Sequence, residues 1–266
     1  MTELLEKYDK LKSELASRGS VAVAFSGGVD SSLLLYAAKD ALGEKAAAIT
    51  VVSPLLSGME KSDADEFCKK FGIRQIILET NPLEIPGFAE NPADRCYICK
   101  RALFEKILAT ARENGFNAVA EGSNTDDDGD YRPGKRATAE LGILTPLRSA
   151  GLSKAEIREL SAHFNLPSAA KPSFACLATR FPTGTLITAE KLKQAEKAEQ
   201  FLYELGFAQF RVRIHGEDAR IEIPQADFEK FIEESTRKAV YEYLRDIGFR
   251  FISLDINGYK TGNMNI

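Results

Sequence analysis

Two glycines stand among hydroxyl side chains and one carboxylate near the N-terminus, in the segment Ser26-Gly27-Gly28-Val29-Asp30-Ser31-Ser32. Glycines allow the backbone to turn sharply and to present its N–H groups to an anion. A helix that starts here adds the positive end of its dipole, and Asp30 can hold Mg²⁺ near bound phosphates. The segment therefore predicts a phosphate site. A tight strand-to-helix turn with capping serines gives the same pattern, and the spacing is not that of a kinase-type P-loop.

Three of the four cysteines stand where metal or redox chemistry is favoured. Cys96 and Cys99 form a CxxC pair at the start of a predicted helix, and Cys176 lies in an irregular segment rich in small and basic residues. A CxxC pair serves zinc, thiol exchange and iron–sulfur ligation alike, and chance spacing on a helix face also produces it. The two histidines, His163 and His215, are not spaced in the sequence as the ligands of a zinc site usually are. We therefore interpret the three cysteines as ligands to three irons of a [4Fe-4S] cluster, whose fourth iron is open to a ligand such as sulfide.

A pair of arginines lies further along the chain. Arg211 and Arg213 are two residues apart on a predicted strand, so both point to one face, which His215 continues. A guanidinium group binds phosphate through two parallel hydrogen bonds. An ordinary solvated strand face explains this spacing equally well.

The glycine loop must be held by the elements around it. Residues 21–25 are apolar throughout, which is typical of a strand buried on both faces. Strand-like runs then alternate with helix-length segments, and this order predicts an α/β fold in which helices cover both faces of a parallel sheet. The predicted strands cover 21–25, 46–52, 75–78 and 118–121, and the predicted helices cover 3–17, 31–42, 62–71, 97–114 and 153–163.

Three regions follow from this pattern. Residues 1–165 are predicted to form the nucleotide-binding domain, and 166–187 a functional loop that carries Cys176. Residues 188–266 are predicted to form a small α+β domain for substrate binding or oligomerisation. Its helices are expected over 188–205 and 226–246, and its strands over 209–215, 219–223 and 249–255. The acidic run at 126–128 is expected to be a solvated loop.

Composition restricts the function further. The chain has 266 residues and a net charge of −4, which disfavours nucleic acid as a partner because phosphate backbones are usually met by an excess of Lys and Arg. A charged N-terminus and the lack of a long apolar run predict a cytoplasmic protein that does not associate with membranes. The cysteines are then reduced, and Cys68, on an apolar face of a predicted helix, is expected in the core.

The segment 26–31 matches completely the SGGxDS signature of the N-type ATP pyrophosphatases, which the chain resembles. The resemblance implies that ATP is split between its α and β phosphates, that a substrate oxygen is adenylated and that pyrophosphate leaves. A nitrogen or sulfur nucleophile then displaces AMP. The residues assigned to binding of ATP and Mg²⁺ are Ser26, Gly27, Gly28, Asp30, Ser31, Ser53 and Gly122.

Motifs over nearly the whole chain narrow the resemblance to the sulfur-inserting enzymes of nickel-pincer nucleotide biosynthesis, the LarE family. In one branch of that family a single cysteine, matching Cys176, gives up its own sulfur and becomes dehydroalanine. Another branch holds an iron–sulfur cluster with three cysteines. Cys96 and Cys99 favour this branch, with Cys176 as a cluster ligand. The motifs are Val23–Gly28, Asp130–Gly134, Arg180–Pro182, Arg211–Arg213 and Asp218–Glu222.

The narrower resemblance also implies a substrate and partners. One carboxylate of pyridinium-3,5-biscarboxylic acid mononucleotide would become a thiocarboxylate, with sulfide from a donor such as a cysteine desulfurase. The protein is expected to form a homo-oligomer, and the family resemblance implies a hexamer. Arg211, Arg213 and Arg180 would bind the substrate phosphate, and Glu199 and Glu222 would gather near the same site. Lys100 would neutralise charge on the phosphates or the acyl-adenylate. Catalysis is assigned to Cys176, Asp30, Lys100 and Arg180.

Two other functions stay open at this point. A tRNA 2-thiolation enzyme can also combine SGGxDS with three cluster cysteines, but the acidic net charge disfavours it. A non-catalytic protein that binds adenine nucleotides on the same scaffold would bind ATP without turnover. An amidating synthetase is less favoured, since ammonia needs no cluster.

Overall fold

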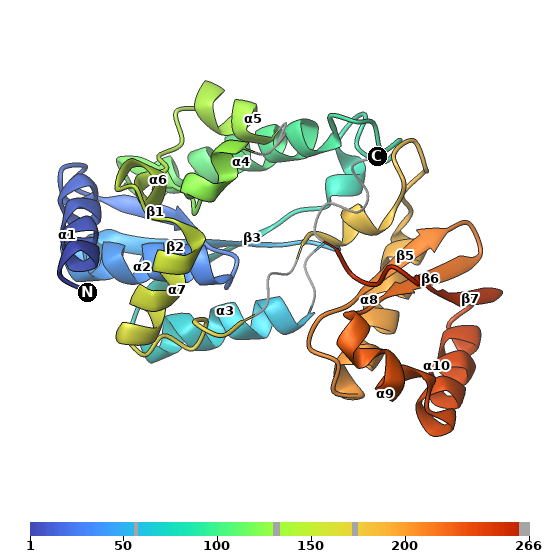
Figure 1. The fold of residues 1–266 in the computed structure, drawn as a ribbon. Coiled ribbons are helices and arrows are strands. Elements are labelled where there is room, and N and C mark those ends of the chain that lie inside the picture. Colours follow the sequence, from blue (N-terminus) through green and yellow to red (C-terminus); the bar gives the residue numbers. More distant parts are fainter. Residues whose placement is uncertain (56–57, 130–133, 172–174, 261–266) are drawn as a thin grey trace. The chain divides into compact units, whose positions relative to one another are not determined.

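The computed structural model of the chain describes residues 1–55, 58–129, 134–171 and 175–260. The chain forms two compact units (Figure 1). The first comprises Met1–Ile85 and Asp94–Phe174, and the second comprises Pro86–Ala93 and Ala175–Ile266. A short segment between two elements of the first unit therefore belongs to the second. The domain boundaries expected from the sequence stay a prediction.

The first unit is built on a four-stranded sheet in the order β3-β2-β1-β4. All three strand pairings are parallel, which confirms the predicted α/β fold. The strands are β1 (Val21–Ala24), β2 (Ala46–Val52), β3 (Arg74–Glu79) and β4 (Ala118–Ala120). The helices are α1 (Thr2–Ala16), α2 (Val29–Leu42), α3 (Gly58–Lys70), α4 (Arg95–Glu113), α5 (Gly134–Glu140), α6 (Pro146–Ser149) and α7 (Lys154–His163).

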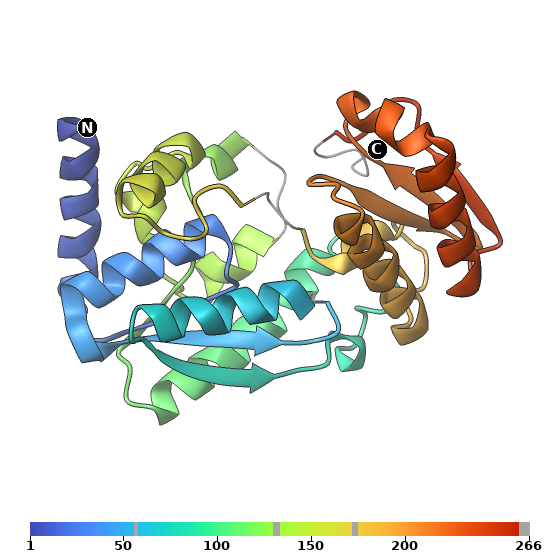
Figure 2. The same ribbon diagram turned by 90° about the horizontal axis from the view of Figure 1, so that it is seen from below.

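Helices cover both faces of this sheet because successive strand residues point to opposite sides. Val21 and Val23 of β1 pack into one apolar cluster with α1, α2 and α7. Ala22, between them, packs into a second cluster with α4. In Figure 1, α4 accordingly lies on one side of the strands and α3 and α7 on the other. Figure 2 shows α3 lying along the sheet.

The helix boundaries differ from the prediction at one important point. Helix α2 begins at Val29, two residues earlier than expected, because Gly28 serves as its extended N-cap. Ser31 and Ser32 therefore lie inside the first turn rather than capping it. The short helices α5 and α6 were not predicted, since neither is long enough to show an apolar period.

The second unit has a three-stranded sheet in the order β5-β6-β7. Strand β5 (Arg211–His215) is antiparallel to β6 (Asp218–Glu222), which is parallel to β7 (Phe251–Leu254). Its helices are α8 (Ala189–Glu204), α9 (Phe228–Ile232) and α10 (Glu234–Asp246). Helix α8 buries Leu192, Ala195 and Leu202 at helical spacing. The predicted small α+β unit is confirmed. In the described part of the chain, no helix combines the length and apolar character needed to cross a membrane.

Candidate active site

The glycine loop connects β1 to α2 at the carboxyl edge of the parallel sheet. Gly27 has a φ of +75°, a left-handed conformation that favours glycine. Gly28 precedes the first N–H groups of α2, which have no acceptor within the helix. The Ser31 hydroxyl donates to Gly28 O at 3.1 Å and lies 3.2 Å from the Ser26 hydroxyl. The loop thus gathers backbone and hydroxyl donors where an anion binds well.

Gly122 meets this loop from the neighbouring strand. Strands β2 and β3 extend the sheet on one side of β1, whereas β4 pairs with its other side. Such a reversal of strand order marks the place where ligands bind in open α/β sheets. Gly122 follows β4 closely, and a Cβ added there would lie 3.0 Å from Ser31 N and 3.2 Å from Asp30 Cβ. Glycine therefore allows this segment to pack directly on the start of α2.

Asp30 contacts two residues that the sequence analysis did not single out. Lys154 Nζ lies 2.5 Å from its Oδ2 atom, and Asn124 Nδ2 donates to Oδ1 at 3.3 Å. The Lys154 and Asp30 side chains are 28% and 25% exposed, so a solute can reach them. Asn124 shortly follows a predicted strand that ends at the same edge, and this position could have indicated it. Lys154 offers no comparable signal in the sequence.

Lys100 and Ser53 also lie at this edge of the sheet. Lys100 Nζ is 3.5 Å from Glu121 Oε2, and Glu121 directly follows β4. The Ser123 hydroxyl donates to the other carboxylate oxygen of Glu121. Ser53 directly follows β2, and its hydroxyl oxygen accepts the N–H of Leu55 at 3.3 Å. The structure therefore places the residues assigned to ATP in the first unit, at the ends of β1, β2 and β4.

The acidic run after β4 differs from the solvated loop that was expected. Asp127 is buried, and its carboxylate accepts the N–H of Asn124 at 3.0 Å. Asp126 accepts the N–H of Lys154, the first residue of α7, at 3.1 Å. The expectation is wrong for Asp127, because its carboxylate satisfies a backbone donor beside the glycine loop. Residues 130–133 of the family motif lie outside the described residues, as do 172–174 of the cysteine-bearing loop.

Cys96 and Cys99 lie at the start of α4. Because they are three residues apart on a helix, their side chains share a face. Cys96 is exposed, whereas Cys99 is largely buried. A guanidinium nitrogen of Arg95 lies 3.9 Å from Cys96 Sγ and brings positive charge to that sulfur. Cys68 lies in the apolar core, as predicted, and burial raises the pKa of its thiol to about 12.

Cys176 lies in the second unit, exposed and directly before the 3₁₀ turn Leu177–Arg180. The buried Arg180 organises this turn. Its Nη1 atom donates to Ala175 O at 2.7 Å and to Cys176 O at 3.1 Å. Its Nε and Nη2 atoms donate to the two carboxylate oxygens of Glu199, each at 2.7 Å. Every side-chain nitrogen of Arg180 is thus engaged, and the residue fixes the backbone at Cys176.

Arg213 supports the same turn from β5. Its Nη1 atom donates to Thr179 O at 2.9 Å. Its Nη2 and Nε atoms donate to Glu222 Oε2 at 2.8 and 3.0 Å. Removing one partner from a buried ion pair typically costs about 3–5 kcal/mol, so such pairs hold their geometry firmly. Glu199 and Glu222 are therefore buried partners of arginines near the Cys176 turn.

Arg211 lies in a region of excess positive charge. Its guanidinium donates to Phe210 O at 2.5 Å and lies 5.1 Å from the Tyr259 ring centroid. Burial, followed by the nearby charge of Arg180, lowers the pKa of Arg211. An anion at this place would relieve the repulsion between the arginines. His215, at the end of β5, is exposed, so the buried part of this strand face carries the arginines alone.

The cysteines give no assembled metal site by themselves. Among the described residues, no group of three or more His, Cys, Asp or Glu side chains is arranged to hold a metal ion. All four cysteines carry thiols rather than disulfides. Cys96 and Cys99 belong to the first unit, and Cys176 belongs to the second.

Comparison with known proteins places these features in a family context. The sequence model of a family described as NAD synthase matches residues 3–89, which contain the glycine loop. The pyridinium-3,5-bisthiocarboxylic acid mononucleotide synthase of Lactiplantibacillus plantarum is 34% identical over 266 residues, or 100% of this chain and 96% of that protein. An uncharacterised protein of Synechocystis sp. is 38% identical over 98% of both chains. A tRNA-specific 2-thiouridylase of Xanthobacter autotrophicus is 31% identical, but over 57% of this chain and 49% of its own.

Proposed function

The chain belongs to the family of pyridinium-3,5-bisthiocarboxylic acid mononucleotide synthases, and we propose that it acts as an ATP-dependent sulfurtransferase on a pyridinium-3,5-biscarboxylic acid mononucleotide. One observation carries the proposal. The glycine loop, Gly122 and Asp30 converge at the carboxyl edge of the sheet, in a chain that matches this synthase from end to end.

The proposed reaction has two steps. A carboxylate oxygen of the substrate attacks the α phosphorus of ATP, the bond to the bridging oxygen of the β phosphate breaks, and pyrophosphate leaves. Sulfide then attacks the acyl carbon, and AMP leaves with the former carboxylate oxygen. Adenylation is needed because AMP is a far better leaving group than oxide. The product is a thiocarboxylate.

The residues at the carboxyl edge supply charge stabilisation for the first step. The N–H groups at the start of α2 bind phosphate oxygens, and the Lys154 ammonium lies beside them. Lys100, next to Glu121, is a second cation for the phosphates or the acyl-adenylate. Mg²⁺ in proteins commonly takes one or two carboxylates together with substrate phosphates. The part-exposed carboxylate of Asp30 fits that requirement.

Cys96, Cys99 and Cys176 are proposed to hold a [4Fe-4S] cluster for sulfide delivery. The donor set fits, since all three are thiols, two of them are exposed, and Cys96 and Cys99 share one helix face. When bound, such a cluster supplies one iron open to an external sulfide. The contribution of the chain itself is to orient the ligands. Arg180 and Arg213 do so for Cys176, because they hold the backbone of its turn.

Arg211 and Arg213 are proposed to bind the phosphate of the substrate. The arginines of this group are Arg180, Arg211, Arg213 and Arg220, and its carboxylates are Glu199, Glu222 and Asp255, so the group carries one positive charge in excess. A buried excess charge favours an anionic ligand strongly. Arg180, whose Nη1 atom alone contacts Ala175 O, Cys176 O and the Thr179 hydroxyl, acts in this proposal by positioning Cys176.

The function is tested with protein reconstituted anaerobically with iron and sulfide. We expect thiocarboxylate product, detected by mass spectrometry, when ATP, Mg²⁺, sulfide and the pyridinium nucleotide are all present. Omission of ATP should abolish it. In parallel, unmodified tRNA replaces the nucleotide. Thiolated tRNA would instead support the 2-thiolation activity, and tight ATP binding without turnover on either substrate would support a non-catalytic binder.

A further inference from the structure

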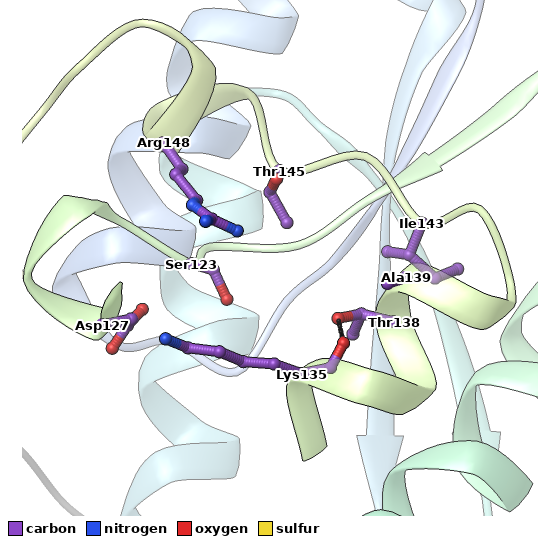
Figure 3. A pocket seen from close by; sticks show the side chains of 8 residues that line it. All are labelled: Ser123, Asp127, Lys135, Thr138, Ala139, Ile143, Thr145 and Arg148. Carbon is purple, nitrogen blue, oxygen red and sulfur yellow. Dashed lines mark hydrogen bonds between the residues drawn. The ribbon is translucent and has the colours of Figure 1, made fainter. Parts of the chain in front are cut away.

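A polar pocket lies next to the candidate ATP site in the first unit (Figure 3). Two basic side chains enter it from different elements, Lys135 from α5 and Arg148 from α6. In Figure 3 the Lys135 ammonium points toward Asp127 and the Arg148 guanidinium toward Ser123. The remaining lining residues are Thr138, Ala139, Ile143 and Thr145.

The pocket shares a wall with the glycine loop. Ser123 and Asp127, which line it, belong to the segment that follows β4. Gly122 of that segment packs on the backbone N of Ser31. The Cα atoms of consecutive residues are about 3.8 Å apart. The pocket therefore begins one residue away from the contact with the phosphate-binding start of α2.

The opposite wall, which contains Thr145 and Arg148, is held next to β4 by backbone hydrogen bonds of the preceding residue, Leu144. The N–H of Leu144 donates to Val119 O at 2.9 Å, and the N–H of Glu121 donates to Leu144 O at 2.9 Å. These bonds extend β4 and place Thr145 and Arg148 just beyond its carboxyl end. One wall of the pocket thus follows β4 in the sequence, and the other directly follows Leu144, which is hydrogen-bonded to β4.

The lining favours an inorganic oxyanion. Two cationic side chains and one carboxylate line the pocket, and the Asp127 carboxylate also accepts the N–H of Asn124. Ala139 and Ile143 are the only apolar residues among those that line the pocket, which leaves little surface for a base or a pyridinium ring. Arginine and lysine with nearby hydroxyl groups are the usual ligands of phosphate oxygens.

The geometry points to a role for this pocket in the proposed adenylation: Lys135 and Arg148 receive the inorganic pyrophosphate that leaves ATP. This inference rests on the proposed function, which generates pyrophosphate beside the pocket wall. Capture there moves the leaving group away from the α phosphate. It thereby opposes the reverse attack of pyrophosphate on the acyl-adenylate.

The experiment titrates the full-length protein with sodium pyrophosphate alone, by calorimetry, and separately with AMP. We expect Lys135→Ala and Arg148→Ala each to weaken pyrophosphate binding by about tenfold or more, because each removes a charged hydrogen-bond donor. AMP binding should change by less than about twofold, since AMP lacks the β and γ phosphates. Lys106→Ala, which removes an exposed lysine of α4, is the matched control and should bind both like the unaltered protein.

Unchanged pyrophosphate binding in both variants, or no pyrophosphate binding by the unaltered protein, would overturn the inference. An equal loss of AMP binding would also overturn it, because the residues would then serve the nucleotide as a whole. These outcomes are distinct from failure of the proposed function. Absence of thiocarboxylate formation, together with pyrophosphate binding that depends on Lys135 and Arg148, would reject the proposed function alone.

Discussion

An Asp30→Asn variant is expected to release pyrophosphate from ATP at least about 100-fold more slowly than the unaltered protein, the usual scale for loss of a group that stabilises transition-state charge. Asparagine keeps the shape of the side chain and its contact with Asn124, but it removes the negative charge. The site then loses its carboxylate for Mg²⁺ and the partner of Lys154. A coupled pyrophosphate assay measures the rate, and circular dichroism checks the fold.

The matched control for this variant is Asp40→Asn. Asp40 lies on the same helix α2 and also pairs with a lysine, Lys12, at 3.2 Å. It lies near the end of the helix that is remote from the glycine loop, so its loss should leave pyrophosphate release within about twofold of the unaltered rate. Pyrophosphate release by Asp30→Asn at the unaltered rate would remove Asp30 from the catalytic site.

The second large effect is expected from substitution of the three proposed cluster cysteines. Cys96→Ala, Cys99→Ala and Cys176→Ala are each expected to lose most of the reconstituted iron and the thiocarboxylate activity, because each removes one of three cluster ligands. Cys68→Ala is the control. Its side chain is 2% exposed and packs in the apolar core, so the variant should keep its iron and lose only stability. Iron and sulfide analysis with the absorption spectrum gives the readout.

The intact mass of the protein after turnover separates the two sources of sulfur. Several products per chain with an unchanged protein mass would support external sulfide. Full iron retention in the Cys96 and Cys99 variants would contradict the cluster. A single product per chain with dehydroalanine at position 176 would do the same, and would make Cys176 the donor of its own sulfur.

The sequence predicted those parts of the site that lie in one stretch of chain. The glycine loop and its buried strand are adjacent, so residue types and spacing were enough to indicate a phosphate site. The order of the strands is set by packing across the sheet, which no local period records. Gly122 was assigned to the site through the resemblance. Its contact with the N-terminus of α2 could not be predicted, because that contact depends on which strands are neighbours in the sheet.

Side-chain partners were the least predictable part. Lys154 is separated from Asp30 by 124 positions, so only the folded chain shows that they pair. In the second unit, Arg180, Glu199, Arg213 and Glu222 were identified as residues of interest. The structure shows how they pair, and that Arg180 binds the carbonyl of Cys176 while Arg213 binds the carbonyl of Thr179 in the turn that follows. Asp127 was expected to be exposed because most carboxylates in proteins are exposed. It is instead buried, and its carboxylate accepts the backbone N–H of Asn124.

The central claim is that ATP adenylates a carboxylate of the pyridinium nucleotide before sulfur enters. It is tested most directly by labelling the substrate carboxylates with heavy oxygen and measuring the mass of the AMP formed with sulfide, ATP and Mg²⁺. If the carboxylate is adenylated, one heavy oxygen moves to AMP for each thiocarboxylate produced. If thiocarboxylate forms while all AMP remains unlabelled, the phosphate was cleaved by water and the proposed adenylation is contradicted.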